Sequence, residues 1–217
     1  MIHVVFHGHS AVEVRASNAP TLLFDPYRPD GLGGRFRLTP IDANPDVLAI
    51  THHHEDHSHR PARWSDVPAI DTSGTCCGLE FEVIPAYHDT ALGTTMGLTS
   101  LIAVQYPGMR IVHLGDLGAP LTDDQRAFIG SPELLIIPMG GTYTLGPEDA
   151  ATLTADIAPG WALPVHGAHP GIDLPLRPLS EFLEAWSGDV LQSKESEAIW
   201  TERPHATRVI ALTPRAR

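Results

Sequence analysis

The stretch VLAITHHHEDH, residues 47–57, joins a short apolar run to a cluster of histidines and acids. The apolar run predicts a buried strand. Because alternate side chains of an extended segment point the same way, His52 and His54 are expected to reach one metal ion together. Asp56 and His57 follow after the chain has turned, so they are placed to bind a second metal beside the first. Imidazole nitrogen and carboxylate oxygen suit zinc and similar divalent metals, so the segment predicts half of a dinuclear site.

A histidine run also has simpler explanations, because solvated loops and purification tags are rich in the same residue. A tag sits at a terminus, whereas residues 52–57 lie well inside the chain of 217 residues. The two acids fall at fixed places after a predicted strand, which is the context that a metal-binding motif requires. The metal-binding interpretation is therefore favoured.

Length and composition set the class of protein. The 217 residues suit one domain, expected to span residues 1–217, with a core of its own. With 42% hydrophobic and 18% charged residues, the chain is predicted to be globular, and its net charge of −12 argues against nucleic-acid or anionic-membrane binding. The N-terminus lacks the basic region of a signal peptide, and no apolar run approaches the ~20 residues of a membrane helix. We therefore expect a cytoplasmic protein without a nucleic-acid or membrane partner.

Cysteine usage fits a reducing compartment. The two cysteines, Cys76 and Cys77, are adjacent and cannot build a disulfide framework. Neighbours in sequence rarely bond to each other. We expect both to be small, buried apolar residues rather than metal ligands.

Hydrophobic periodicity and turn residues predict a mixed α/β chain. The expected strands cover residues 2–7, 11–14, 21–24, 47–50, 81–84, 98–106, 110–113, 134–138, 161–165 and 207–212. The expected helices cover residues 122–128, 147–157 and 179–186, with one or two helical turns within 58–64. Thr122 is a suitable N-cap and Pro147 a suitable first helical residue. Short turns between the first strands imply that the sheet starts antiparallel.

Residues 27–46 are predicted to form a long irregular loop, because glycines and prolines interrupt them. The loop ends where the strand before the histidines begins, so it is expected to overhang the site. Its arginines, Arg28, Arg35 and Arg37, suit an anionic substrate, although a solvated loop with ordinary surface arginines explains them equally well.

Three more ligand-type residues follow directly after predicted strands. His88 and His166 each stand at a strand end, and Asp116 lies between two glycines that let the backbone approach a neighbour closely. A carboxylate has two oxygens, so Asp116 is expected to bridge two metals. His113 lies inside an apolar run and is expected in the core, and His169 is expected to be a loop residue.

The motif Thr51-His52-x-His54-x-Asp56-His57, followed in order by His, Asp and His, resembles the signature of the metallo-β-lactamase-fold hydrolase superfamily. The resemblance covers roughly residues 2–170, and it is similar in particular to a compact branch of metal-dependent hydrolases near the ascorbate-6-phosphate lactonases. It implies a four-layer αββα sandwich with the site at one edge between the sheets. The metal ligands that it implies are His52, His54, Asp56, His57, His88, Asp116 and His166.

The same resemblance implies a chemistry. Two divalent metal ions, zinc first with manganese or iron as alternatives, would share a water that attacks an ester, lactone or phosphodiester of a small molecule. Asp56 is expected to bind the second metal and to steer the proton of the attacking water. His9 and Tyr143 are expected to contact the substrate, and Glu55 to orient a ligand histidine.

Two other classes of function stay open at this point. One is a non-catalytic metal-binding or sensing protein on the same fold, which would be expected to have lost ligands. The other is a di-iron redox enzyme. His54 stands where the redox relatives would carry Glu, which favours the hydrolase.

Overall fold

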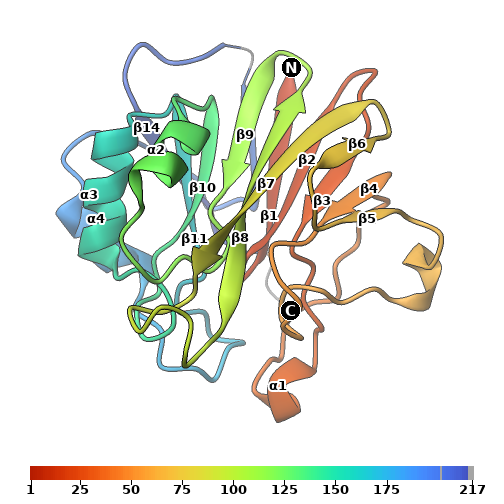
Figure 1. Cartoon of the computed structure of the whole chain (residues 1–217), viewed down its shortest axis with the longest axis horizontal. Coiled ribbons are helices and arrows are strands. Elements are labelled where there is room, and N and C mark those ends of the chain that lie inside the picture. The colour runs from red at the N-terminus through yellow and green to blue at the C-terminus, as the bar shows by residue number, and fades with distance from the viewer. Residues whose placement is uncertain (201, 215–217) are drawn as a thin grey trace.

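Two β-sheets face each other in the computed structural model, which describes residues 1–200 and 202–214 (Figure 1). In spatial order the first sheet consists of β13 (Glu197–Trp200), β1 (Ile2–Gly8), β2 (Ala11–Ala16), β3 (Leu22–Phe24), β4 (Val47–Ala49) and β5 (Ala69–Ile70). The second consists of β12 (Asp189–Gln192), β14 (Arg208–Ala211), β11 (Trp161–Val165), β10 (Leu134–Pro138), β9 (Met109–His113), β8 (Leu98–Tyr106), β7 (Leu79–Tyr87) and β6 (Gly74–Cys76). The mixed α/β fold that the sequence predicts is confirmed.

The core between the sheets follows from the alternation of side chains along each strand. On β1, Val4 and Phe6 point into this core, where they share a cluster with Ile136 and Leu163 of the second sheet. The parallel strands β10 and β11 are buried at every position, because layers cover both of their faces. Each buried leucine or isoleucine contributes about 1.5–3 kcal/mol of burial free energy, which holds the sandwich together.

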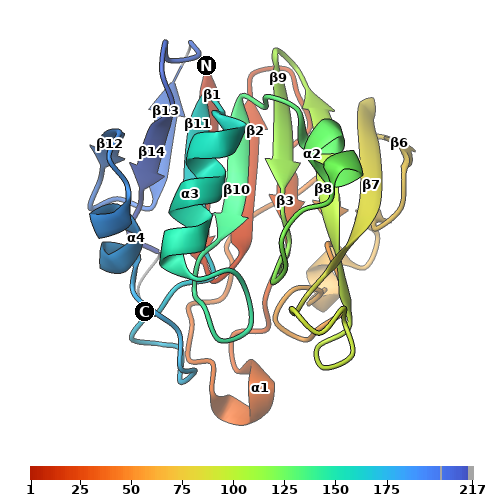
Figure 2. The same cartoon turned by 60° about the vertical axis from the view of Figure 1, so that its left-hand side comes forward.

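Helices cover the outer face of the second sheet (Figure 2). They are α2 (Asp123–Ile129), α3 (Pro147–Ile157) and α4 (Leu179–Ala185). The predicted caps are confirmed, since Thr122 accepts a hydrogen bond from the backbone N–H of Gln125 and Pro147 is the first residue of its helix. In the described part of the chain, no helix combines the length and the apolar composition that spanning a membrane requires.

The outer face of the first sheet is covered by irregular chain. The predicted loop runs across it, with Phe36 and Leu38 buried against the sheet. Its short element α1 (Gly31–Gly34) is not a regular helix, because Leu32 and Gly33 have positive φ angles. The short 3₁₀ helix η1 (Ala62–Trp64) completes this layer and buries Trp64, and it lies within residues 58–64, where the sequence predicts one or two helical turns. The fourth layer of the sandwich, which we call the loop layer, therefore consists mostly of loop.

The strand connections agree with the prediction at the start and depart from it at the edges. Strands β1, β2 and β3 are antiparallel, as expected from their short turns. The short edge strands β5, β6, β12 and β13 carry no alternating apolar pattern and were not predicted. Of these, β13 pairs with β1, so the chain returns from the second sheet and adds an edge strand to the first.

The prediction that both cysteines are buried is wrong. Cys77 is exposed and Cys76 is partly exposed, and both are free thiols. The pair lies at the turn between β6 and β7, where Cys77 and Gly78 both have positive φ angles. A tight turn at a sheet edge leaves side chains in solvent, which explains the exposure.

Candidate metal centre

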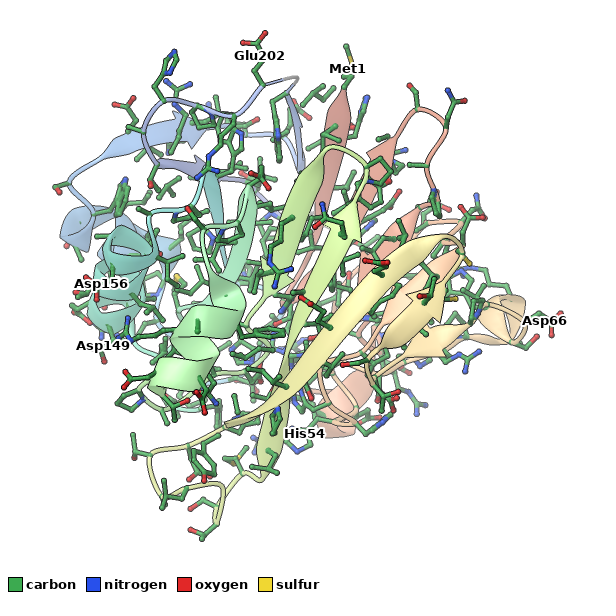
Figure 3. The ribbon with its side chains drawn as sticks, turned by 45° about the horizontal axis from the view of Figure 1, so that its top comes forward. Met1, His54, Asp66, Asp149, Asp156 and Glu202 are labelled. Atoms are coloured by element: carbon green, nitrogen blue, oxygen red, sulfur yellow. The ribbon has the colours of Figure 1, made fainter. Side chains whose placement is uncertain are left out.

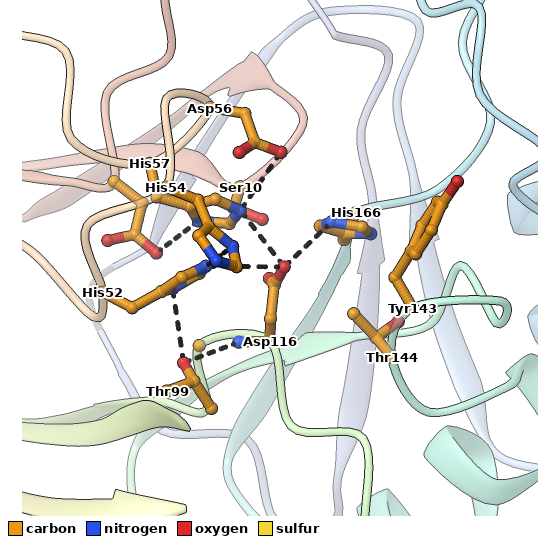
Figure 4. Close-up of polar contacts among 12 residues, drawn as sticks. Ser10, His52, His54, Asp56, His57, Thr99, Asp116, Tyr143, Thr144 and His166 are labelled. Carbon is orange, nitrogen blue, oxygen red and sulfur yellow. Dashed lines mark hydrogen bonds and ion pairs between the residues drawn. The ribbon is translucent and has the colours of Figure 1, made fainter. Parts of the chain in front are cut away.

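The predicted ligands converge at one edge of the sandwich, where His54 lies in Figure 3. The histidine motif follows β4, His88 follows β7, Asp116 lies beyond β9, and His166 follows β11. Strands that end at the same edge therefore bring together all seven side chains from four distant parts of the sequence. Figure 4 labels six of them, namely His52, His54, Asp56, His57, Asp116 and His166.

These side chains form two clusters with Asp116 between them. The ligand atoms of His52, His54 and His88 lie within 4.8 Å of one another. A second group, within the same limit, consists of Asp56, His57, His166 and also His9. Each cluster has the size and the donor types of a site for one divalent cation.

Asp116 reaches both clusters through one oxygen. Its Oδ2 lies 3.2 Å from Nε2 of His88 and 3.9 Å from Nε2 of His52. The same oxygen lies 3.2 Å from Nε2 of His57 and 3.1 Å from Nε2 of His166. A carboxylate in this central position can hold two cations at once.

Two glycines allow Asp116 to sit this close to its neighbours. At Gly115, which has a φ of +54°, a Cβ would lie 2.2 Å from Oγ1 of Thr99. At Gly118 a Cβ would lie 2.2 Å from the carbonyl oxygen of His88. No side chain fits at either position, which is the close backbone approach that the flanking glycines predict.

Asp25, at the end of β3, is a site residue that the sequence analysis missed. It is fully buried, and its carboxylate accepts hydrogen bonds from Thr51 N at 2.8 Å and Thr51 Oγ1 at 2.6 Å. It also lies 2.9 Å from Nδ1 of His57, which leaves Nε2 of that ring facing Asp116. Such a carboxylate fixes the tautomer and the orientation of a ligand histidine. The signal in the sequence was only an Asp at a strand end.

Glu55 does not orient a ligand histidine, so that expectation is wrong. Its Oε2 accepts a hydrogen bond from the backbone N–H of Leu32 at 2.8 Å, and its Oε1 lies 3.4 Å from Nη1 of Arg28. The side chain points out of the motif, and it fastens the loop layer to the metal-binding segment.

His9 lies behind the site. Its side chain is buried, and its Nε2 lies 2.9 Å from Oδ2 of Asp56. Its carbonyl oxygen accepts a hydrogen bond from the backbone N–H of His166 at 2.7 Å, and its ring packs against Phe36. His9 is thus placed to position Asp56 and His166.

A cavity of about 500 Å³ opens over the two clusters. Its lining includes Tyr143 but not His9, and the loop layer contributes Leu32 and Arg35 to the wall. The loop therefore overhangs the site, as the sequence predicts. Of the two other histidines considered, His113 is buried and accepts a hydrogen bond from Gly115 N, and His169 accepts one from Gly171 N in a loop.

Electrostatics at the centre favour ionised carboxylates. Burial lowers the pKa of His52 to about 3, and the charge of His57 adds to that shift. Burial alone would lower the pKa of His57, but the carboxylates of Asp116 and Asp56 outweigh it and raise that pKa. Burial would raise the pKa of Asp116, yet His166 and His57 hold it well below its usual value. A cation that binds here therefore meets ionised carboxylates.

The donor atoms at the centre fit a metal. Buried polar atoms normally have hydrogen-bond partners. Nε2 of His57 and Nε2 of His88 lie 3.2 Å from Asp116 Oδ2 but make no well-directed hydrogen bond to it or to another described residue. Oδ1 of Asp116 is likewise buried without a hydrogen-bond partner among the described residues. Imidazole nitrogens and a carboxylate oxygen that converge without hydrogen bonds match the ligand set of zinc, manganese or iron.

Two facing sheets, with a histidine and aspartate cluster at one edge, define a protein of the metallo-β-lactamase fold. The model of the beta-lactamase superfamily domain matches residues 3–166, so this chain belongs to that superfamily. The assignment that the sequence motif suggests is therefore confirmed. The finer likeness to the ascorbate-6-phosphate lactonases stays a prediction.

Relatives and solved structures agree with this assignment. A "UPF0173 metal-dependent hydrolase" of Enterococcus faecalis is 28% identical over 198 residues, which cover 76% of this chain and 86% of the relative. A metallo-beta-lactamase superfamily protein of Thermotoga maritima superposes with a TM-score of 0.75 at 22% identity, over 98% of this chain and 99% of its own. A diiron β-hydroxylase of Streptomyces venezuelae shares the fold at a TM-score of 0.52 and 13% identity, over 87% of this chain and 48% of its own. The fold alone therefore does not select the reaction.

Proposed function

We propose that this protein is a dinuclear metal-dependent hydrolase of small-molecule esters, lactones or phosphodiesters. The observation that carries the proposal is the position of Asp116, whose single oxygen Oδ2 contacts histidines of both clusters. One carboxylate between two complete groups of ligands is the arrangement that two neighbouring cations need. The UPF0173 relatives, which are named metal-dependent hydrolases, support the same class.

The proposed division of ligands follows the two clusters. His52, His54 and His88 would hold the first metal. The second metal would be held by Asp56, His57 and His166, and Asp116 would reach both. Bound divalent metals supply a Lewis acid for the substrate oxygen and lower the pKa of water to about 7.

The chain's own residues prepare the reaction around these ligands. Asp25 holds the His57 ring with Nε2 turned inward, and His9 holds the Asp56 carboxylate. Asp56 lines the cavity, so its carboxylate is placed to accept the proton of the attacking water. Tyr143 lines the same cavity and is placed to donate a hydrogen bond to the substrate. The sheets behind the centre exclude bulk water, which strengthens each of these interactions.

A di-iron redox enzyme is the second candidate function. The fold that this chain shares with the diiron β-hydroxylase is the observation that supports this candidate. The donors at the centre suit zinc, manganese and iron alike. We propose zinc first. The single domain over residues 1–217, the cytoplasmic location and the lack of a nucleic-acid partner also stand as proposals.

Metal content and turnover, measured on the same preparation, test the proposed function. We expect about two zinc or manganese ions per chain and hydrolysis of at least one member of a lactone, ester and phosphodiester panel. The matched variants are His54→Ala and His53→Ala, because His53 is exposed and pairs with Asp71 outside both clusters. His54→Ala should lose metal and turnover, whereas His53→Ala should keep both.

Other outcomes separate the alternatives. Two irons with an oxygen-dependent optical spectrum would favour the redox enzyme. Full metal loading without turnover of any substrate would favour a non-catalytic metal-binding protein. A protein that takes up no metal under any loading condition would contradict the whole assignment.

A further inference from the structure

The lining of the cavity over the centre combines apolar and polar side chains. Leu32, Met96 and Leu174 contribute apolar surface, and all three are partly exposed. The same lining includes the ligand side chains His54, Asp56, His88, Asp116 and His166. A substrate that fills this space must therefore present apolar surface as well as the bond that breaks.

Arg35 is the only arginine or lysine among the described residues that line the cavity. Its guanidinium makes no hydrogen bond or ion pair within residues 1–200 and 202–214. Arg28 on the same loop differs, because its charge is balanced by Asp30 at 3.3 Å and Glu55 at 3.4 Å. The charge of Arg35 is therefore available to a ligand in the cavity.

The backbone around Arg35 is fixed on both sides. Its carbonyl oxygen accepts a hydrogen bond from Asp173 N at 2.8 Å, and the next residue, Phe36, forms a β-bridge with Ile172. On the other side, Glu55 holds Leu32 N at 2.8 Å. The guanidinium is thus attached to a segment with a defined position at the wall of the cavity.

We propose that Arg35 binds a carboxylate or phosphate group of the substrate. The apolar part of that substrate packs against Leu32, Met96 and Leu174, while the scissile bond lies at Asp116. The substrate class is then an amphipathic anion with a hydrolysable ester, lactone or phosphodiester. This inference rests on the proposed hydrolase function and adds the chemistry that the substrate must carry.

Matched substrates test the inference on the metal-loaded, full-length protein. Three esters share one acyl chain and one leaving group, and end in a carboxylate, a phosphate or a neutral amide. A charge-assisted guanidinium contact predicts that the better anionic ester has a KM about 10- to 100-fold below that of the neutral one. The KM values of the carboxylate ester and the phosphate ester show which anion the site prefers.

Variants on the loop assign the effect to one side chain. Arg35→Ala should raise the KM of the anionic ester about 10- to 100-fold, leave kcat nearly unchanged and leave the neutral ester unaffected. Arg37→Ala is the matched control, because Arg37 is exposed on the same loop but does not line the cavity, and it should behave as the unmodified protein. Arg35→Lys should restore part of the affinity, since a lysine keeps the charge without the planar fork.

The outcomes separate this inference from the proposed function. Equal KM values for charged and neutral esters, unchanged in Arg35→Ala, would overturn the role of Arg35 and leave the hydrolase standing. If the metal-loaded protein hydrolyses no ester, lactone or phosphodiester, the proposed function fails. In that case, the affinity for the amphipathic carboxylate product, measured by calorimetry, tests the proposed role of Arg35 in anion binding. Binding weakened in Arg35→Ala but not in Arg37→Ala supports the anion site, and equal binding in both variants refutes it.

Discussion

The two sheets of this protein are covered in different ways. The second sheet carries three helices, which satisfy most of their backbone hydrogen bonds internally. The first sheet is covered mainly by loop. Backbone N–H groups of that loop form hydrogen bonds with residues far away in the sequence, such as Arg37 N with Gly171 O and Leu32 N with the Glu55 side chain. The helical layer can therefore hold its shape without the metal centre, whereas the loop layer is tied to it.

A pair of large-to-small substitutions gives the strongest test of this difference. Phe182 in the helical layer and Phe36 in the loop layer are both fully buried. Replacing either with alanine should cost about 3–5 kcal/mol of unfolding free energy, measured by denaturant titration. Only Phe36→Ala should also weaken metal binding, because the Phe36 ring packs against His9 at a centroid distance of 4.9 Å. Equal loss of metal affinity in both variants would contradict the division between the layers.

The carboxylate beneath the metal centre gives the next largest effect. Asp25→Asn keeps the shape of the side chain but removes the charge that holds His57, so metal affinity should fall about 10- to 100-fold in a competition titration with a chelator. Asp71→Asn is the control, because Asp71 pairs with His53 on the exposed side of the same motif. If Asp71→Asn weakens metal binding as strongly, the buried contact of Asp25 has no special role.

The link between the loop layer and the metal motif should contribute about 1–2 kcal/mol, as expected for hydrogen bonds to a charged group. Glu55→Ala removes both of its contacts with the loop, at Leu32 and Arg28. Trypsin should then cut at the loop arginines about 5- to 30-fold faster, since 1.4 kcal/mol corresponds to a factor of ten.

A comparable exposed pair serves as the control for Glu55. Glu82 pairs with Arg110 at 2.8 Å on the second sheet, and Glu82→Ala should leave the rate of cleavage in residues 28–37 unchanged. Faster cleavage there in Glu82→Ala would indicate a general loss of stability rather than a local link.

The smallest effect belongs to a helix cap. Thr122→Ala removes the side-chain acceptor for Gln125 N and should cost about 1 kcal/mol of unfolding free energy. Metal affinity should stay the same, because α2 covers the second sheet away from the ligand clusters. Thr122→Ser keeps the hydroxyl and should restore the lost stability. A change in metal affinity would show that the helical layer is not independent of the centre.

The helical layer was also the part that the sequence predicted best. The residues that fix α2 and α3 are local, namely a capping threonine and a proline at the first position. The histidine motif was equally local, and the other candidate ligands were selected because each follows a predicted strand. The fold class and the family were predicted for the same reason.

What the sequence did not reveal depends on contacts between distant residues. Asp25 contacts His57, which lies 32 positions away in the sequence, and no residue pattern near Asp25 predicts that contact. The role of Glu55 is set by the path of the loop, which has no periodic pattern. The exposure of the cysteines follows from a turn between two strands, one of which has too few apolar residues to be recognised.

The pairing of β13 with β1 completes the first sheet and has a consequence for the order of folding during synthesis. Its partner strand β1 is synthesised before β13, and residues 9–196 lie between the two, so the first sheet stays incomplete until those residues have emerged. His9 likewise meets His166 only late, through the hydrogen bond between their backbones. Such distant pairings slow folding, because the ends of a long segment must meet before they are stabilised. During synthesis the ligands of the proposed first metal are complete at Asp116, whereas those of the second are complete only at His166, so the first set of ligands is available before the second.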